Sequence, residues 1–146
     1  MEKLGNNLLG DKDFVETLIP QRFPFVMVDK LYSYSETQLV SGFTIPNDAL
    51  FLEKDNFLES GIIEHMAQSV ALHTGYQFYL RNMQAPTGYI GSIKDIVIDK
   101  LPKLHDEVRT TVSILQEFGG ITLVDVVTTL NDVEIAKGQM KTVLAK

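Results

Sequence analysis

Cysteine is absent from all 146 residues of this sequence. Without a thiol the chain forms no disulfide, offers no thiolate to a metal and has no cysteine nucleophile, which is typical of a protein from a reducing compartment. Long apolar runs are absent too, because no stretch approaches the roughly 20 residues that a membrane-spanning helix needs. The N-terminal residues also lack the apolar centre of a secretory signal peptide. The expected location is therefore the cytoplasm.

Positive charge is scarce. The chain has 13 Lys and Arg against 19 Asp and Glu, a formal net charge of −6, which argues against nucleic acid as the main partner. Metal-ligand spacing is not seen, since His65 and His73 lie eight residues apart along the chain. No glycine-rich loop suited to phosphates is seen either. The sequence therefore predicts neither a metal nor an organic cofactor.

Repeats, low-complexity segments and linkers are missing, and 146 residues correspond to one domain, residues 1–146. Helices are expected at residues 11–18 and 60–80. Strands are expected at residues 25–31, 39–45, 88–98, 108–117, 121–130 and 134–144. Gly119-Gly120 marks a hairpin between two of these strands. One long helix and an antiparallel sheet of about five to six strands predict an α+β fold in which the sheet wraps around the helix.

The helix expected at residues 60–80 is apolar on nearly every side, which is typical of a buried helix. Glu64 lies about one turn inside this helix, and a carboxylate there is costly to bury unless it is paired or protonated. Gln68 follows four residues later on the same face. It is expected either to orient Glu64 by a hydrogen bond or to fill a packing gap. Glu64 is therefore the first candidate for a catalytic group.

Two blocks of the sequence resemble the β-hydroxyacyl-acyl-carrier-protein dehydratases of fatty acid synthesis, which have the hot-dog fold. Residues 19–29, Ile-Pro-Gln-Arg-Phe-Pro-Phe-Val-Met-Val-Asp, are similar to that family's Leu-Pro-His-Arg-Tyr-Pro-Phe-Leu-Leu-Val-Asp. Residues 62–68, Ile-Ile-Glu-His-Met-Ala-Gln, are similar to its Ile-Ile-Glu-Ala-Met-Ala-Gln. The resemblance covers nearly the whole chain, and it implies a hot-dog fold with a long central helix inside a curved antiparallel sheet.

The chain departs from that family at the catalytic histidine. The family carries this residue in a Gly-His-Phe-Pro-Gly segment before the helix, whereas residues 47–61 contain no histidine and Gln21 replaces the histidine of the first block. Dehydratase-like proteins of aryl-polyene and related pigment pathways resemble this chain in the helix motif and in the shortened segment. His65 and His73 are expected to be core or interface residues with satisfied ring nitrogens, and His105 is expected to face solvent in a turn.

The resemblance implies that water is eliminated from a β-hydroxyacyl thioester to give a trans-2-enoyl thioester. Glu64 would move the protons, and Gln68 would orient it. The backbone amides of Gly61 and Ile62 at the start of the helix would stabilise the enolate oxygen; alternatively, Gly61 simply begins the helix. The residues expected to contact the acyl group are Gln21, Phe25, Phe57 and Ile62.

The same resemblance implies a homodimer, or a higher oligomer, whose sheets pair edge to edge with the acyl tunnel at the interface. The acyl group would arrive on acyl carrier protein, which is acidic, so docking requires a local basic patch. The candidate cations are Arg81, Lys94, Lys100 and Lys103. Two other functions stay open: a hot-dog thioesterase that uses the same helix carboxylate, and a non-catalytic subunit that binds acyl chains or pairs with an active relative.

Overall fold

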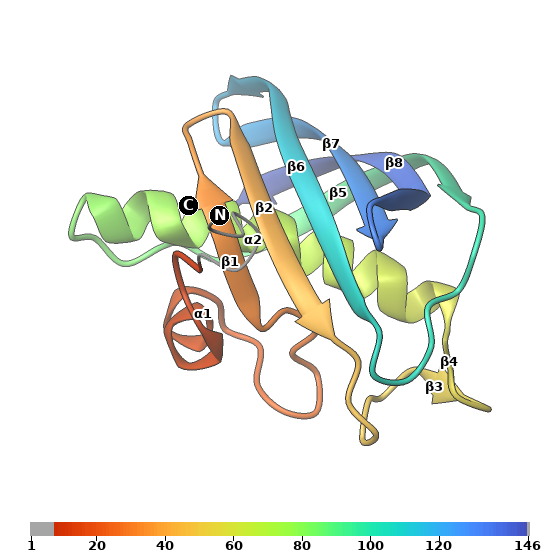
Figure 1. Ribbon diagram of the computed structural model, residues 1–146. Coiled ribbons are helices and arrows are strands. Elements are labelled where there is room, and N and C mark those ends of the chain that lie inside the picture. The colour runs from red at the N-terminus through yellow and green to blue at the C-terminus, as the bar shows by residue number, and fades with distance from the viewer. Residues whose placement is uncertain (1–7, 146) are drawn as a thin grey trace, which may run out of the picture.

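The computed structural model describes residues 8–145 and shows one long helix packed against a curved antiparallel sheet (Figure 1). The helices are α1 (Lys12–Leu18) and α2 (Glu59–Leu80). The strands are β1 (Lys30–Tyr34), β2 (Gln38–Thr44), β3 (Leu52–Glu53), β4 (Asn56–Phe57), β5 (Gly88–Ile98), β6 (Glu107–Phe118), β7 (Ile121–Leu130) and β8 (Val133–Leu144). The main sheet has the order β1-β2-β6-β7-β8-β5, with every neighbouring pair antiparallel, and this confirms the predicted hot-dog arrangement.

Alternation along the central strands places the core between the sheet and α2. In β6, Val108, Thr110 and Val112 are buried, whereas the residues that alternate with them are half-buried. Successive side chains of a strand point to opposite faces, so one face of the sheet is apolar. Met66 of α2 is fully buried in the same core cluster. Each such side chain stabilises the fold by about 1.5–3 kcal/mol relative to the exposed state.

The first predicted strand, residues 25–31, is wrong in most of its length, because β1 begins only at Lys30. The reason is that side chains of α2 take the place of a neighbouring strand. Gln68 binds the Phe25 carbonyl and the Met27 amide, and His65 binds the Met27 carbonyl. The other predicted strands and both helices are confirmed to within two residues. The short β3–β4 hairpin was not predicted.

The two edges of the main sheet differ. At β1, Leu31 exchanges backbone hydrogen bonds with Gly10, which covers part of that edge. At β5, no residue is buried, and Tyr89 and Val97 are 61% and 45% exposed. A long strand with unpaired backbone groups is a template for pairing with another chain. The β5 edge therefore leaves backbone groups of the sheet available for pairing.

A glycine sets the distance between the two helices. At Gly75, an added Cβ would collide with the backbone carbonyl oxygen of Leu18 in α1. We expect Gly75→Ala to lower the free energy of unfolding by about 1–3 kcal/mol, because a backbone atom cannot rotate away. This loss should appear although alanine is the better helix former. Urea denaturation followed by circular dichroism measures it.

The matched control is Gly88→Ala. The nearest atom to a Cβ at Gly88 is 3.6 Å away, which is ordinary contact. Its stability should therefore stay within about 0.5 kcal/mol of the wild type. Equal stabilities of the two variants would contradict the close approach of α1 and α2 at Gly75.

Candidate active site

A cavity of about 740 Å³ lies beside α2, within the range of roughly 300–1,000 Å³ that small-molecule sites occupy. One wall is the face of α2 that carries Glu64, Gln68 and Ala71. The second wall is the segment 17–22, which comprises the end of α1 and the residues after it, and the third is the segment 83–90, which includes the start of β5. Among the described residues that line it, only Glu64 and Arg22 are charged. The carboxylate predicted from the sequence therefore lines a real cavity.

Gln68 holds Glu64 through a fixed carboxamide. Its Oε1 accepts the Met27 amide at 2.6 Å, and its Nε2 donates to the Phe25 carbonyl and to Glu64 Oε2, both at 2.8 Å. Only one orientation of the amide satisfies this set, because an N–H must donate and a carbonyl must accept. Both sequence-based expectations for Gln68 thus apply: it fills the gap beneath the segment 25–27 and it contacts the candidate acid.

His65 belongs to the core and does not line the cavity. Its Nδ1 donates to the Met27 carbonyl at 2.7 Å, so the neutral ring accepts at Nε2 from Thr110 Oγ1, 2.9 Å away. Thr128 then donates to Thr110 at 2.6 Å, which completes the chain. Burial lowers the pKa of His65 to about 4, opposed by its bond to Met27. The residue stays neutral and structural, as predicted.

The remaining histidines also behave as predicted. His73 is buried, its Nε2 donates to the Ser35 carbonyl at 3.0 Å, and burial lowers its pKa below the ordinary value. His105 is exposed in the turn before β6, at a backbone φ of 73°. None of the histidines in residues 8–145 lines the cavity.

The start of α2 corrects the prediction for the enolate-binding amides. The amides of Gly61 and Ile62 both donate to the Leu58 carbonyl, at 2.9 and 3.1 Å, so they are already engaged, and neither residue lines the cavity. A Cβ at Gly61 would collide with the ring of Phe57. Phe57 is itself fully buried. Glycine thus suits the close packing at this position, and Ile62 and Phe57 are both buried in the core outside the cavity lining.

Of the other two predicted acyl contacts, Gln21 and Phe25, the structure places one in the cavity lining. Gln21 lines it, and its Oε1 is shielded from solvent with no hydrogen-bond partner in the described part of the chain. An unpaired buried acceptor costs about 1–3 kcal/mol, so a hydrogen-bond donor beside Gln21 Oε1 would stabilise the protein. Phe25 is 59% exposed and does not line the cavity, although its carbonyl binds Gln68.

The predicted docking cations do not form one patch within a single chain. Arg81 follows the C-terminal end of α2, whereas Lys103 donates to Asn56 in β4, directly before α2. The 22 residues of α2 separate these two ends by about 33 Å at 1.5 Å per residue. Lys100 lies close to Lys103 in the β5–β6 connection, and Lys94 is exposed in β5. Of the four, only Lys100 and Lys103 share one connection.

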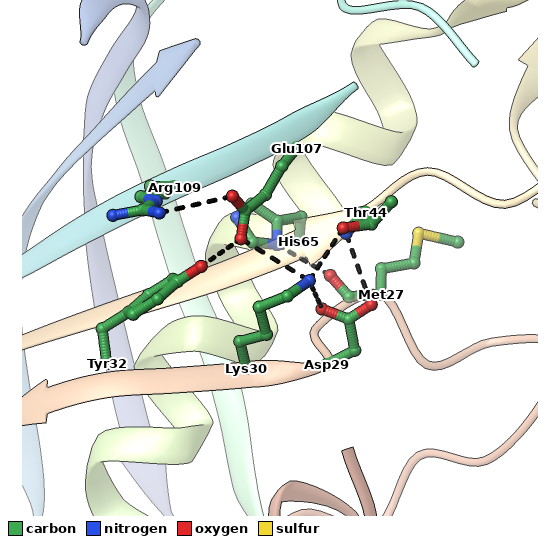
Figure 2. Close-up of polar contacts among 8 residues, drawn as sticks. All are labelled: Met27, Asp29, Lys30, Tyr32, Thr44, His65, Glu107 and Arg109. Atoms are coloured by element: carbon green, nitrogen blue, oxygen red, sulfur yellow. Dashed lines mark hydrogen bonds and ion pairs between the residues drawn. The ribbon is translucent and has the colours of Figure 1, made fainter. Parts of the chain in front are cut away.

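A polar cluster fixes the start of β1 on the sheet face opposite α2. The outer-face cluster consists of Asp29, Lys30, Tyr32, Thr44, Glu107 and Arg109 (Figure 2). Lys30 Nζ contacts Asp29 at 3.0 Å and Glu107 at 3.5 Å. Burial opposes the charge on Glu107, but the Tyr32 hydroxyl and the neighbouring cations lower its pKa below the ordinary value. Burial and Glu107 in turn raise the pKa of Tyr32 to about 12. The cluster thus anchors the chain two residues after Met27.

The family model described as ApeP dehydratase, of the ApeP-like group, matches residues 14–144. The chain belongs to the ApeP-like dehydratase family. No curated protein matches it. No helix within residues 8–145 combines the length and the apolar character needed to cross a membrane.

Solved structures show how this ApeP-like chain compares in fold. The dehydratase heterocomplex ApeI:P from Xenorhabdus doucetiae is 15% identical, with a TM-score of 0.84 over 90% of this chain and 91% of that one. A hypothetical thioesterase with coenzyme A from Streptococcus pneumoniae TIGR4 is 14% identical, with a TM-score of 0.64 over 79% and 84%. Cj0977, a sigma28-regulated virulence protein from Campylobacter jejuni, is 10% identical, with a TM-score of 0.73 over 100% and 96%. At these identities the comparison establishes a shared fold.

Sequence reasoning missed part of the ApeP-like cavity. Arg22 lies in the first resembling block but was not assigned to the site, and it lines the cavity next to Gln21. The wall formed by residues 83–90 was also missed. The small residues of α2, Ala67, Ala71 and Gly75, were a usable signal. At Ala67 and Ala71 the short side chains leave room for the cavity, which Gly75 also lines.

Proposed function

We propose that this ApeP-like protein eliminates water from a β-hydroxyacyl thioester carried on acyl carrier protein, in fatty acid or polyene-type synthesis. The observation that carries the proposal is the cavity beside α2, where Glu64 is the one carboxylate among the described lining residues and is held by Gln68. Membership of a dehydratase family supports the same reaction class.

A single carboxylate can serve both proton transfers. Glu64 removes a proton from Cα, electrons of that C–H bond form the Cα=Cβ double bond, and the Cβ–O bond breaks. The departing hydroxide takes the same proton back from Glu64 and leaves as water. The product is a trans-2-enoyl thioester, and Glu64 returns to the carboxylate form. A group that gives and takes one proton in this way must stay in one position, and the Gln68 hydrogen bond supplies that restraint.

The proposed assembly is a dimer formed through β5. No residue of β5 is buried, and its edge is open, so a second copy of this chain can extend the sheet. The segment 83–90, which leads into β5, lines the cavity, so a subunit added there would lie close to the site. A dehydratase of similar fold is a heterocomplex, which makes a related hot-dog chain the alternative occupant of this edge.

The decisive experiment offers the purified protein β-hydroxyacyl thioesters on acyl carrier protein and on pantetheine. A rise in enoyl absorbance without free thiol is the expected result. Thiol release without enoyl product would show a thioesterase, which is the second candidate function for a cavity that contains Glu64. Neither product, alone or with a related hot-dog chain added, would show a non-catalytic subunit and overturn the proposal.

Removing the Gln68 carboxamide should affect both rate and stability. Gln68→Met keeps a similar volume but leaves the Met27 amide and the Phe25 carbonyl unpaired, so the free energy of unfolding should fall by about 1–3 kcal/mol. Turnover should fall by about 10- to 100-fold, because Glu64 loses its positioning partner. Gln77→Met on the same helix, outside the cavity lining, is the matched control. Unchanged turnover in a folded Gln68→Met protein would contradict the positioning role.

A further inference from the structure

We propose that Arg22 and Gln21 form a carrier-arm subsite at this cavity. In this subsite Arg22 binds the phosphate of a phosphopantetheine arm, and Gln21 accepts a hydrogen bond from an amide N–H of the same arm. The inference rests on the proposed function, because it identifies the carrier group of the thioester on which Glu64 would act. Coenzyme A and acyl carrier protein both present this arm, so the shared chemistry is a phosphate joined to a chain with two amides.

The charges of the cavity support a phosphate at Arg22. Arg22 is the one cation among the described residues that line it, and Glu64 is the one anion. An anionic ligand group is repelled by Glu64 and attracted by Arg22, so it would lie at the Arg22 end while a neutral thioester lies at Glu64. The side chain of Arg22 is 57% exposed, which places its guanidinium where a solvated phosphate can reach it.

The guanidinium of Arg22 is held in place by the backbone. Its Nη1 donates to the carbonyls of Ile19 and Gln21, both at 2.8 Å. Its Nε lies 4.0 Å from Glu16, at the outer limit of an ion pair between partly exposed groups, and such pairs contribute little. Nη1 is anchored, so a phosphate would bind the Nε and Nη2 edge and displace Glu16 from its weak contact with Nε. The planar fork of this edge matches two oxygens of a phosphate.

Gln21 supplies the second observation. Its Oε1 is shielded from solvent and lacks a partner within residues 8–145, although the residue lines the cavity. A buried acceptor of this kind gains from any N–H that approaches it. The pantetheine arm carries two amide N–H groups between its phosphate and its sulfur. A turn of the flexible Gln21 side chain toward the cavity would present Oε1 to one of them.

Short hydrogen-bonded steps connect the carrier-arm subsite to the candidate acid. The Phe25 amide donates to the Arg22 carbonyl at 2.7 Å. The Phe25 carbonyl accepts from Gln68 Nε2, which also donates to Glu64. The segment 22–25, through its contact with Gln68, would thus position both the phosphate-binding Arg22 and the proton-transferring Glu64. An arm held at Arg22 would deliver its thioester along this segment.

The test uses two 3-hydroxyacyl thioethers with the same acyl chain, one on pantetheine and one on 4′-phosphopantetheine, with affinities measured by calorimetry at low salt. The wild type should bind the phosphorylated ligand about 10-fold more tightly, the gain expected of a charge-assisted pair. Arg22→Gln should abolish this preference and leave the pantetheine affinity unchanged. Arg22→Lys, which keeps the charge without the fork, should retain part of the preference. Arg81→Gln, at the far end of α2, should keep all of it.

Gln21→Leu should weaken both thioethers by the same factor, about fivefold, because both carry the amides; unchanged affinities would remove Gln21 from the subsite. Equal binding of the two ligands by the wild type, or a preference that survives Arg22→Gln, would overturn the role of Arg22. A phosphate preference without any dehydration would overturn the proposed function alone. Failure of the wild type to bind either ligand would overturn both.

Discussion

Glu64→Gln is expected to reduce kcat for β-hydroxyacyl thioester dehydration by about 10²–10⁴-fold, the usual contribution of a general acid–base group. Glutamine has nearly the shape of glutamate, and its side-chain oxygen can still accept the hydrogen bond that Gln68 Nε2 donates at 2.8 Å. The segment 25–27 and the cavity wall should therefore stay in place. The loss would come from proton transfer, because a carboxamide cannot take up a proton from Cα.

The effect should appear in kcat and leave ligand affinity nearly unchanged. Continuous enoyl absorbance gives the rate, and calorimetry with the unreactive 3-hydroxyacyl thioether gives the affinity. Glu59→Gln is the matched control, since Glu59 is an exposed carboxylate in the first turn of the same helix. A Glu64→Gln protein with the wild-type kcat would show that another group moves the proton, and it would remove the central residue from the proposed mechanism.

The acid could be found from the sequence because its signal is local. A carboxylate in a helix that is apolar on nearly every side stands out without any knowledge of the fold, and its partner Gln68 follows at the helical spacing of four. The signals for most strands were also local. β7 spans the predicted residues 121–130, and the turn at Gly119 and Gly120 lies where it was predicted, with φ of 61° and 81°.

The errors came from contacts that join distant parts of the chain. The segment 25–29 has the composition of a strand, but its backbone groups bind Gln68 and His65, which lie about 40 residues later. The amides of Gly61 and Ile62 were expected to be open, yet the helix begins early enough for Leu58 to accept both. The local sequence pattern cannot show either contact, because each depends on which residue pairs with a given backbone N–H or carbonyl group in the folded protein.

Arg22 was missed for a related reason. An arginine two residues after a proline reads as an ordinary surface cation, and only the packing of α1 against Gly75 brings the segment 17–22 alongside α2. For the predicted docking cations the error was to group residues that lie far apart. Arg81 and Lys103 were grouped by charge, but they lie near opposite ends of the long helix α2.

His65→Leu is expected to lower the free energy of unfolding by about 2–4 kcal/mol at neutral pH, because the Met27 carbonyl and the Thr110 hydroxyl lose a buried partner, each loss costing about 1–3 kcal/mol. His105→Asn, an exposed histidine replaced by a residue that tolerates positive φ, should stay within about 0.5 kcal/mol. Activity should fall with His65→Leu as well, since Met27 is held by both His65 and Gln68.

The pH dependence of stability separates burial of His65 from simple packing. In the unfolded chain this ring takes up a proton near pH 6.5, whereas in the folded protein its pKa is about 4. The unfolded state therefore binds more protons between these values, and the wild type should lose up to roughly 3 kcal/mol of stability as the pH falls from 6.5 to 4. His65→Leu should lack this part of the loss, while the smaller part due to buried His73 remains. Identical pH profiles for the two proteins would mean that the His65 ring titrates alike folded and unfolded. The hydrogen-bonded frame that runs from Thr128 through His65 and Met27 to Gln68, and so to Glu64, would then lose its first support.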